Sequence, residues 1–155
     1  MQSKPYYFDD HVLGERQLGG RYRLSGDEMI NYATQWDPQP WHTDRVAAKD
    51  SPFAGLTACS SHLFAIYCIT SQDWQSGFMP VAMAGLGFDD LRIIRPAYEG
   101  DTLACVSVVE SLKASLSKPD RGIVSYRSKL VNDADEEVFS IISSVMVKRR
   151  RSEQN

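Results

Sequence analysis

The second half of the chain is dominated by positions that alternate between apolar and polar residues. This period of two is typical of half-buried β-strands. The strands predicted on this pattern cover residues 81–88, 102–112, 122–132 and 137–148. Turn-forming residues rich in Pro, Asp, Asn and Gly separate the later strands at 119–122 and 132–135. The second half therefore predicts an antiparallel sheet.

The first half opens with one strand and then changes to helical spacing. Residues 17–24 suit a strand, and Gly19 and Gly20 inside it indicate a β-bulge. The spacing that begins at Ser25 is that of a capping box, which predicts the start of a helix. That helix must end just before Pro38, because proline also restricts the residue that precedes it.

Two more helices are predicted downstream. The first is short, capped by Thr43 and ending at Lys49. The second covers residues 56–70, where apolar side chains leave almost no polar face. A helix of this composition must be surrounded by protein, and the predicted sheet is the element that can surround it. The sequence therefore predicts an α+β domain, an antiparallel sheet wrapped around one long central helix.

Length and composition are those of one globular domain. The 155 residues fit a single unit, which we take to cover 1–155 with peripheral segments at 1–15 and 149–155. Hydrophobic residues make up 43% and charged residues 24% of the chain, which is ordinary for a soluble protein. The formal net charge is −3, so no nucleic-acid partner is expected, because such binding needs a dense basic face. The basic run at 148–151 is expected to be a solvated tail.

Cysteine and histidine usage narrows the class of protein further. Cys59, Cys68 and Cys105 form no C-x-x-C pair and are odd in number, which does not suit a disulfide framework. A reducing compartment, most simply the cytoplasm, is therefore expected. No signal peptide is expected at the N-terminus, and no apolar run is long enough to predict a membrane span. The histidines lack metal-ligand spacing, so no metal site is predicted.

The stretch between Asp37 and His42 carries the candidate chemistry. It places a carboxylate and an imidazole five positions apart, with Pro38 and Pro40 holding the backbone outside the helical region. Such a pair can act on one water, with one group taking a proton and the other delivering one. The alternative is structural, with Asp37 capping the turn and His42 on the surface. Spacing alone favours this alternative, because Asp and His often lie near each other.

Four stretches of the sequence resemble one protein family. Asp37-x-x-Pro40-x-His42 is similar to the D-x-N-P-x-H signature of the MaoC-like, (R)-specific enoyl-CoA hydratases, with Gln39 where that family usually has Asn. Further segments of the family resemble residues 53–58, 95–103 and 118–124. The resemblance extends over nearly the whole chain and favours the catalytic interpretation of Asp37 and His42.

This resemblance implies a fold, an assembly and a reaction. It implies the hotdog fold, a homodimer whose active site includes parts of both subunits, and an acyl-CoA thioester as substrate with no separate cofactor. Asp37 and His42 would hold a water that adds to the β-carbon of a trans-2-enoyl-CoA while a proton reaches the α-carbon, giving an (R)-3-hydroxyacyl-CoA. The family's oxyanion donor is a glycine amide early in the central helix, and the corresponding position here is Ser60.

Five residues near these motifs have secondary expectations. His62 is expected to be a hydrogen-bonded buried histidine without a catalytic role. Aromatic or thioether side chains that could line an acyl pocket are Trp36, Trp41, Met79 and Met83. Core or interface packing is the alternative for these four.

Two other functions use the same fold and ligand. A hotdog thioesterase attacks the thioester carbonyl and usually has a carboxylate on the central helix, but residues 56–70 contain no Asp or Glu. A non-catalytic acyl-CoA-binding dimer would have no use for Asp37 and His42. The sequence therefore favours a hydratase and leaves the length, branching and substituents of the acyl group open.

Overall fold

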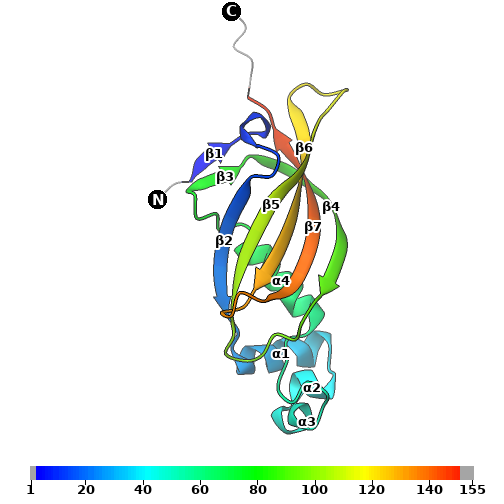
Figure 1. The fold of residues 1–155 in the computed structure, drawn as a ribbon. Coiled ribbons are helices and arrows are strands. Elements are labelled where there is room, and N and C mark those ends of the chain that lie inside the picture. Colours follow the sequence, from blue (N-terminus) through cyan, green and yellow to red (C-terminus); the bar gives the residue numbers. More distant parts are fainter. Residues whose placement is uncertain (1–2, 151–155) are drawn as a thin grey trace, which may run out of the picture.

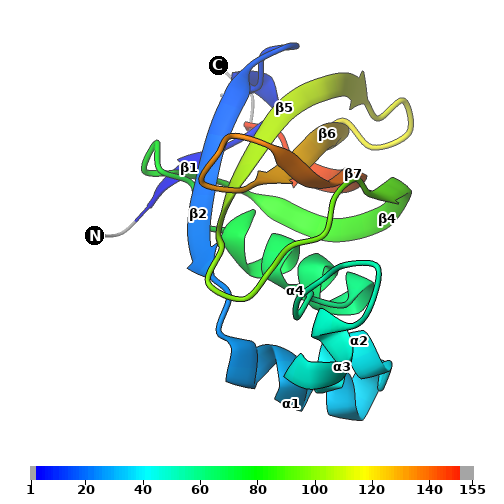
Figure 2. The same cartoon turned by 60° about the horizontal axis from the view of Figure 1, so that its bottom comes forward.

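A five-stranded antiparallel sheet bends around one helix in the computed structural model, which describes residues 3–150. The strand order is β2-β5-β6-β7-β4, with bounds β2 (Arg16–Arg23), β4 (Ala82–Ile93), β5 (Thr102–Ala114), β6 (Arg121–Val131) and β7 (Glu137–Lys148). The central helix α4 (Ser60–Thr70) lies against the concave face of the sheet (Figures 1 and 2). The predicted α+β architecture is confirmed.

The central helix begins four residues later than its apolar sequence suggests. Residues 56–59 are extended, because the Ala58 amide donates to the Ala97 carbonyl at 2.9 Å and Thr57 forms a β-bridge with Tyr98. The prediction of a helix from residue 56 is therefore wrong at its start. Burial of Leu63 and Ile66 against the sheet accounts for the helical part.

The bulge predicted in β2 is present at the glycine pair. The register with β5 shifts between Leu18 and Arg21, so Gly19 and Gly20 together lie opposite the single residue Cys105. A Cβ on Gly19 would lie 2.5 Å from the carbonyl oxygen of Thr70 at the end of α4. Glycine is needed here because the strand and the helix end approach so closely.

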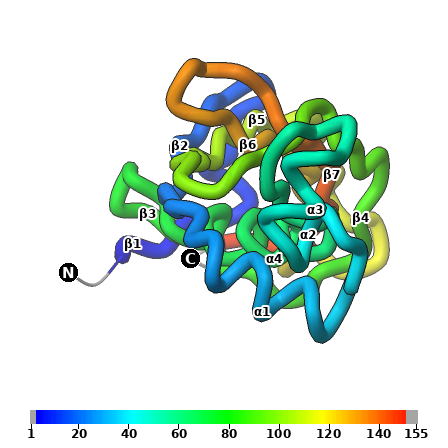
Figure 3. The backbone as a smooth tube through the Cα atoms, turned by 90° about the horizontal axis from the view of Figure 1, so that it is seen from below, coloured from blue at the N-terminus to red at the C-terminus, as the bar shows by residue number. Residues whose placement is uncertain are grey.

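Three short helices gather at one end of the sheet (Figure 3). In α1 (Gly26–Trp36), Ser25 is the N-cap as predicted, and its side chain accepts from the Glu28 amide. The sequence did not predict α2 (Pro40–Thr43), whose first residue is a proline, because proline terminates a preceding helix but is also well placed to begin one. The N-cap of α3 (Arg45–Lys49) is Asp44 and not Thr43.

The segment after β1 contacts the segment after β7 at the opposite end of the sheet. β1 (Lys4–Tyr6) pairs in parallel with β3 (Phe78–Pro80), and η1 (Phe8–Asp10) follows β1. Two aspartates of η1 form ion pairs with the C-terminal basic run, Asp9 with Arg149 at 2.6 Å and Asp10 with Arg150 at 2.7 Å. The predicted solvated tail is wrong for these two arginines. The predicted peripheral segments, 1–15 and 149–155, remain a prediction, and 1–2 and 151–155 lie outside the described residues.

The edge strand β4 is exposed along its whole length. All twelve of its residues are accessible to solvent, and five large apolar side chains are between 42% and 54% exposed, namely Met83, Leu86, Phe88, Leu91 and Ile93. A long apolar edge with unpaired backbone groups is a surface on which another strand can add.

In residues 3–150, no helix has both the length and the hydropathy needed to cross a membrane.

Candidate active site

Asp37 lies at the junction between α1 and α2. It is the C-cap of α1, where its amide donates to the Ala33 carbonyl at 2.8 Å. Its side chain is half-buried, and none of residues 3–150 forms a hydrogen bond with its carboxylate. The carboxylate can therefore accept hydrogen bonds from a water or a substrate.

His42 is held in one tautomer by its surroundings. Its Nδ1 lies 2.7 Å from the Thr57 carbonyl oxygen, and since a carbonyl only accepts, Nδ1 carries the proton. The indole Nε1 of Trp41 donates to Nε2 at 3.1 Å, which leaves Nε2 as an acceptor. Sequence reasoning did not identify Thr57 or the role of Trp41, because neither partner is specified by the spacing of Asp37 and His42.

Ser60 is the first residue of α4, and the His42–Thr57 bond ties α2 to the segment just before α4. The amides of His62 and Leu63 both donate to the Cys59 carbonyl at 3.1 Å, so the amides of Ser60 and Ser61 precede the helical hydrogen bonds. Free amides at a helix N-terminus favour a negative charge. The Ser60 side chain is exposed.

His62 is buried next to this junction, and the prediction that it is hydrogen-bonded is wrong, because neither ring nitrogen forms a hydrogen bond within residues 3–150. The ring is 3% exposed and stacks on Tyr32, with centroids 4.4 Å apart. Nε2 lies 4.0 Å from a carboxylate oxygen of Glu28, and Nδ1 has no hydrogen-bond partner within residues 3–150. Aromatic stacking takes the place of the expected bond. Burial lowers the pKa of His62, and the nearby Glu28 opposes that shift.

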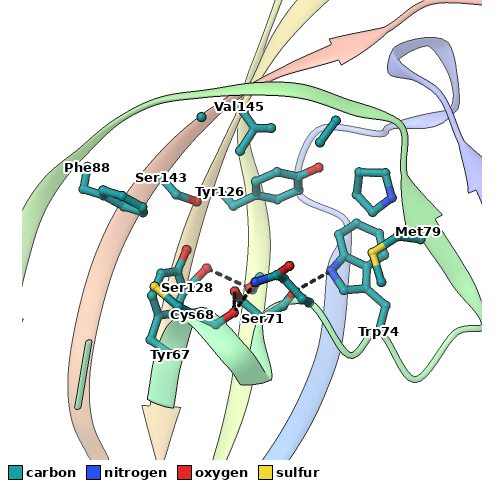
Figure 4. Close-up of a pocket in the computed structure, with 15 residues that line it drawn as sticks. Tyr67, Cys68, Ser71, Trp74, Met79, Phe88, Tyr126, Ser128, Ser143 and Val145 are labelled. Atoms are coloured by element: carbon teal, nitrogen blue, oxygen red, sulfur yellow. Dashed lines mark hydrogen bonds between the residues drawn. The ribbon is translucent and has the colours of Figure 1, made fainter. Parts of the chain in front are cut away.

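A cavity of about 480 Å³ lies between the C-terminal half of α4, the inner face of the sheet and the start of β4. Figure 4 shows Tyr67, Cys68 and Ser71 of the α4 region facing Tyr126, Ser143 and Val145 of the sheet. Met79 lines this cavity, and its predicted place in an acyl pocket stays a prediction. Met83 does not line it, and neither do Trp36, which is 65% exposed, and Trp41.

Comparisons with known proteins identify one family. The sequence profile of the MaoC-like domain matches residues 12–132. A mesaconyl-CoA hydratase from Cereibacter sphaeroides is 38% identical over 93% of this chain, which spans 41% of that protein. The crystal structure of a MaoC-like dehydratase from Rhodospirillum rubrum has a TM-score of 0.84 and 31% identity, covering 95% of this chain and 99% of that one. An (R)-hydratase from A. caviae involved in PHA biosynthesis has a TM-score of 0.66 at 17% identity, covering 90% and 98%, and supports the hotdog fold alone.

Proposed function

The chain belongs to the MaoC-like dehydratase family, and on that premise we propose that it is a hydro-lyase that adds water reversibly to a trans-2-enoyl-CoA. The product is an (R)-3-hydroxyacyl-CoA. One observation carries this proposal: Asp37 caps α1, His42 follows in α2, and the His42–Thr57 bond fastens α2 to the chain just before α4. In the proposed site, the carboxylate, the imidazole and the free helix amides act together at this junction.

In the proposed reaction, Asp37 and His42 share one water. His42 carries its proton on Nδ1, so Nε2 is the nitrogen that accepts a hydrogen bond from this water. The water replaces the Trp41 indole as the donor to Nε2. The water oxygen bonds to the β-carbon as the carbon–carbon double bond breaks. One water proton goes to the pair, and the pair returns a proton to the α-carbon. The net change is the addition of one water.

Ser60 is the proposed oxyanion donor. Negative charge moves onto the thioester oxygen as water adds, and a donor already in place lowers the energy of that state. The Ser60 amide suits this role because it opens α4, an eleven-residue helix, whose dipole is positive at this end. The structure does not favour a thioesterase, because α4 has no carboxylate side chain.

The active form is proposed to be a homodimer joined along β4. Like strands related by a twofold axis pair in antiparallel orientation. β4 begins beside the cavity, which Ala82 and Gly85 line, and it ends at Ile93. Shortly after Ile93 the chain reaches Ala97, which pairs with Ala58 in the segment before α4. Antiparallel pairing would therefore bring the segment from Asp37 to His42 of one copy next to the cavity of the other. The acyl group would then cross the interface.

Turnover of crotonyl-CoA tests the function, followed as loss of the enoyl-thioester absorbance. Asp37→Asn is expected to lower kcat/KM by about 10²–10⁴-fold, the range for a positioned acid–base group, with an unchanged circular dichroism spectrum. Asp120→Asn is the control, because Asp120 is exposed and pairs only with Arg121 in a turn. Release of free thiol without loss of the double bond would indicate a thioesterase. An Asp37→Asn variant within a few-fold of the parent would remove Asp37 from the mechanism.

A further inference from the structure

Hydroxyl groups line the cavity on a face of the sheet that would ordinarily be apolar. These hydroxyls come from α4, β6 and β7, and the residues that carry them are only 1–6% exposed, namely Tyr67, Tyr126, Ser128 and Ser143. A mostly apolar pocket that contains a few buried polar groups is typical of a small-molecule site, in which the polar groups fix the ligand's orientation. The hydrogen-bonding capacity of these hydroxyls therefore indicates which polar groups a ligand of this cavity can carry.

The hydrogen bond between Tyr126 and His11 fixes which way the Tyr126 hydroxyl can act. Nδ1 of His11 lies 2.8 Å from the Tyr7 carbonyl oxygen and so carries a proton. Burial lowers the pKa of His11, which keeps the ring neutral and its Nε2 without a proton. The Tyr126 hydroxyl, 2.6 Å away, donates to this Nε2. Its oxygen can only accept a hydrogen bond from a ligand.

Two ligand classes fit this cavity poorly. A carboxylate would be buried without a counter-ion, because no Lys or Arg among residues 3–150 lines the cavity. It would also face a Tyr126 oxygen that has no proton to give. A hydrocarbon chain would leave the Tyr126 oxygen without a ligand partner, in a place where it is also shielded from water. A neutral hydroxyl fits, since it can donate to the Tyr126 oxygen, which accepts without needing a counter-ion.

We propose that this cavity binds an acyl group that carries a hydroxyl beyond the reacting double bond, so that hydroxylated enoyl-CoA thioesters are the preferred substrates. The proposal rests on the proposed hydratase function. It adds that the hydroxyl of the acyl group donates to the Tyr126 oxygen.

Matched pairs of thioesters test the proposal. We expect kcat/KM for 6-hydroxy-trans-2-hexenoyl-CoA or its 8-hydroxy-octenoyl homologue to exceed that of the unsubstituted thioester of the same length by about tenfold, the effect of one net hydrogen bond. The carboxylate analogue trans-2-hexenedioyl-CoA is expected to be the poorest of the six-carbon substrates. No preference for the hydroxyl at either length, or a preference for the carboxylate, would overturn the proposal.

Two variants separate the Tyr126 oxygen from its bond to His11. Tyr126→Phe removes the acceptor and is expected to remove most of the preference for the hydroxylated thioester over the unsubstituted thioester of the same length. His11→Phe is the control, since it breaks the same hydrogen bond but keeps the Tyr126 oxygen. An equal loss of preference in both variants would assign the effect to packing and contradict the proposal.

Measuring ligand binding by calorimetry tests the cavity independently of catalysis. The saturated ligands 6-hydroxyhexanoyl-CoA and hexanoyl-CoA need no catalysis, so tighter binding of the first supports the cavity assignment even if no enoyl-CoA is hydrated. Absence of turnover with every enoyl thioester would contradict the proposed function. Equal binding of the two saturated ligands, together with equal turnover of the matched pairs, would contradict only the inference about the cavity.

Discussion

At the scale of single residues, Ser60 decides how the oxyanion is stabilised. Its amide opens α4 while its side chain is exposed, so the backbone is the expected donor. Ser60→Ala and Ser60→Gly are therefore expected to keep kcat within a few-fold of the parent, with Gly weakening the helix by up to about 1 kcal/mol. If Ser60→Ala instead loses about 10²-fold in kcat with its fold intact, the hydroxyl itself stabilises the transition state.

Two buried histidines make stability depend on pH. Burial lowers the pKa of His11 and His62 below the ordinary value of 6.5, so the unfolded chain binds these protons more readily than the folded one. Their contribution to stability is complete above that value and is lost as pH falls through the folded-state pKa. The free energy of unfolding, measured with urea from about pH 8 to pH 5, is expected to decrease as pH falls.

His62→Phe isolates one of the two contributions. Phenylalanine retains an aromatic ring to stack on Tyr32 and has no proton to gain. The variant is expected to lose part of the decrease in stability below the ordinary histidine pKa. An unchanged dependence on pH would show that protonation of His62 is not coupled to folding.

At the scale of elements, the bulge of β2 fixes the distance between the sheet and the end of α4. Gly19→Ala would place its Cβ 2.5 Å from the Thr70 carbonyl oxygen and 3.0 Å from the Cβ of Cys105, so backbone must move. We expect a loss of about 1–3 kcal/mol in the free energy of unfolding, the usual cost of overpacking.

Gly20→Ala is the matched control for this bulge. The Cβ added there would meet the end of the Asp73 side chain at 2.8 Å, and Asp73 is exposed and can turn away. Gly20 is itself buried, but its nearest neighbour is the end of an exposed side chain and not backbone, so its loss in the free energy of unfolding is expected to be smaller than that of Gly19→Ala. Equal losses at the two glycines would show that the close approach of β2 to α4 does not limit stability.

At the scale of the whole molecule, β4 is the expected dimer interface. Leu86→Lys places a charge on the exposed strand, 47% accessible at this position, and is expected to weaken the dimer at least tenfold, because a charge is costly to bury. Leu116→Lys is the control, since Leu116 is fully exposed in the turn between β5 and β6. Sedimentation and crotonyl-CoA turnover are measured together. A monomer that remains fully active would contradict an active site shared between subunits.

Local sequence determined most elements of the fold, because each signal acts over a few neighbouring residues. Alternation predicted β5, β6 and β7, the glycine pair predicted the bulge of β2, and Ser25 predicted the N-cap of α1. The motif between Asp37 and His42 identified the candidate pair for the same reason. Its catalytic role remains a prediction.

Tertiary structure decided what depends on neighbours distant in sequence. Residues 56–59 are apolar enough for a helix, but their pairing with residues 97 and 98 makes them extended. The hydroxyl-lined cavity was not visible in the sequence, because a serine in an alternating strand looks the same whether its face is covered or not. Only the packing of α4 and β4 over Ser143 and Tyr126 makes those hydroxyls buried, and burial is what gives a polar group its influence on ligand choice.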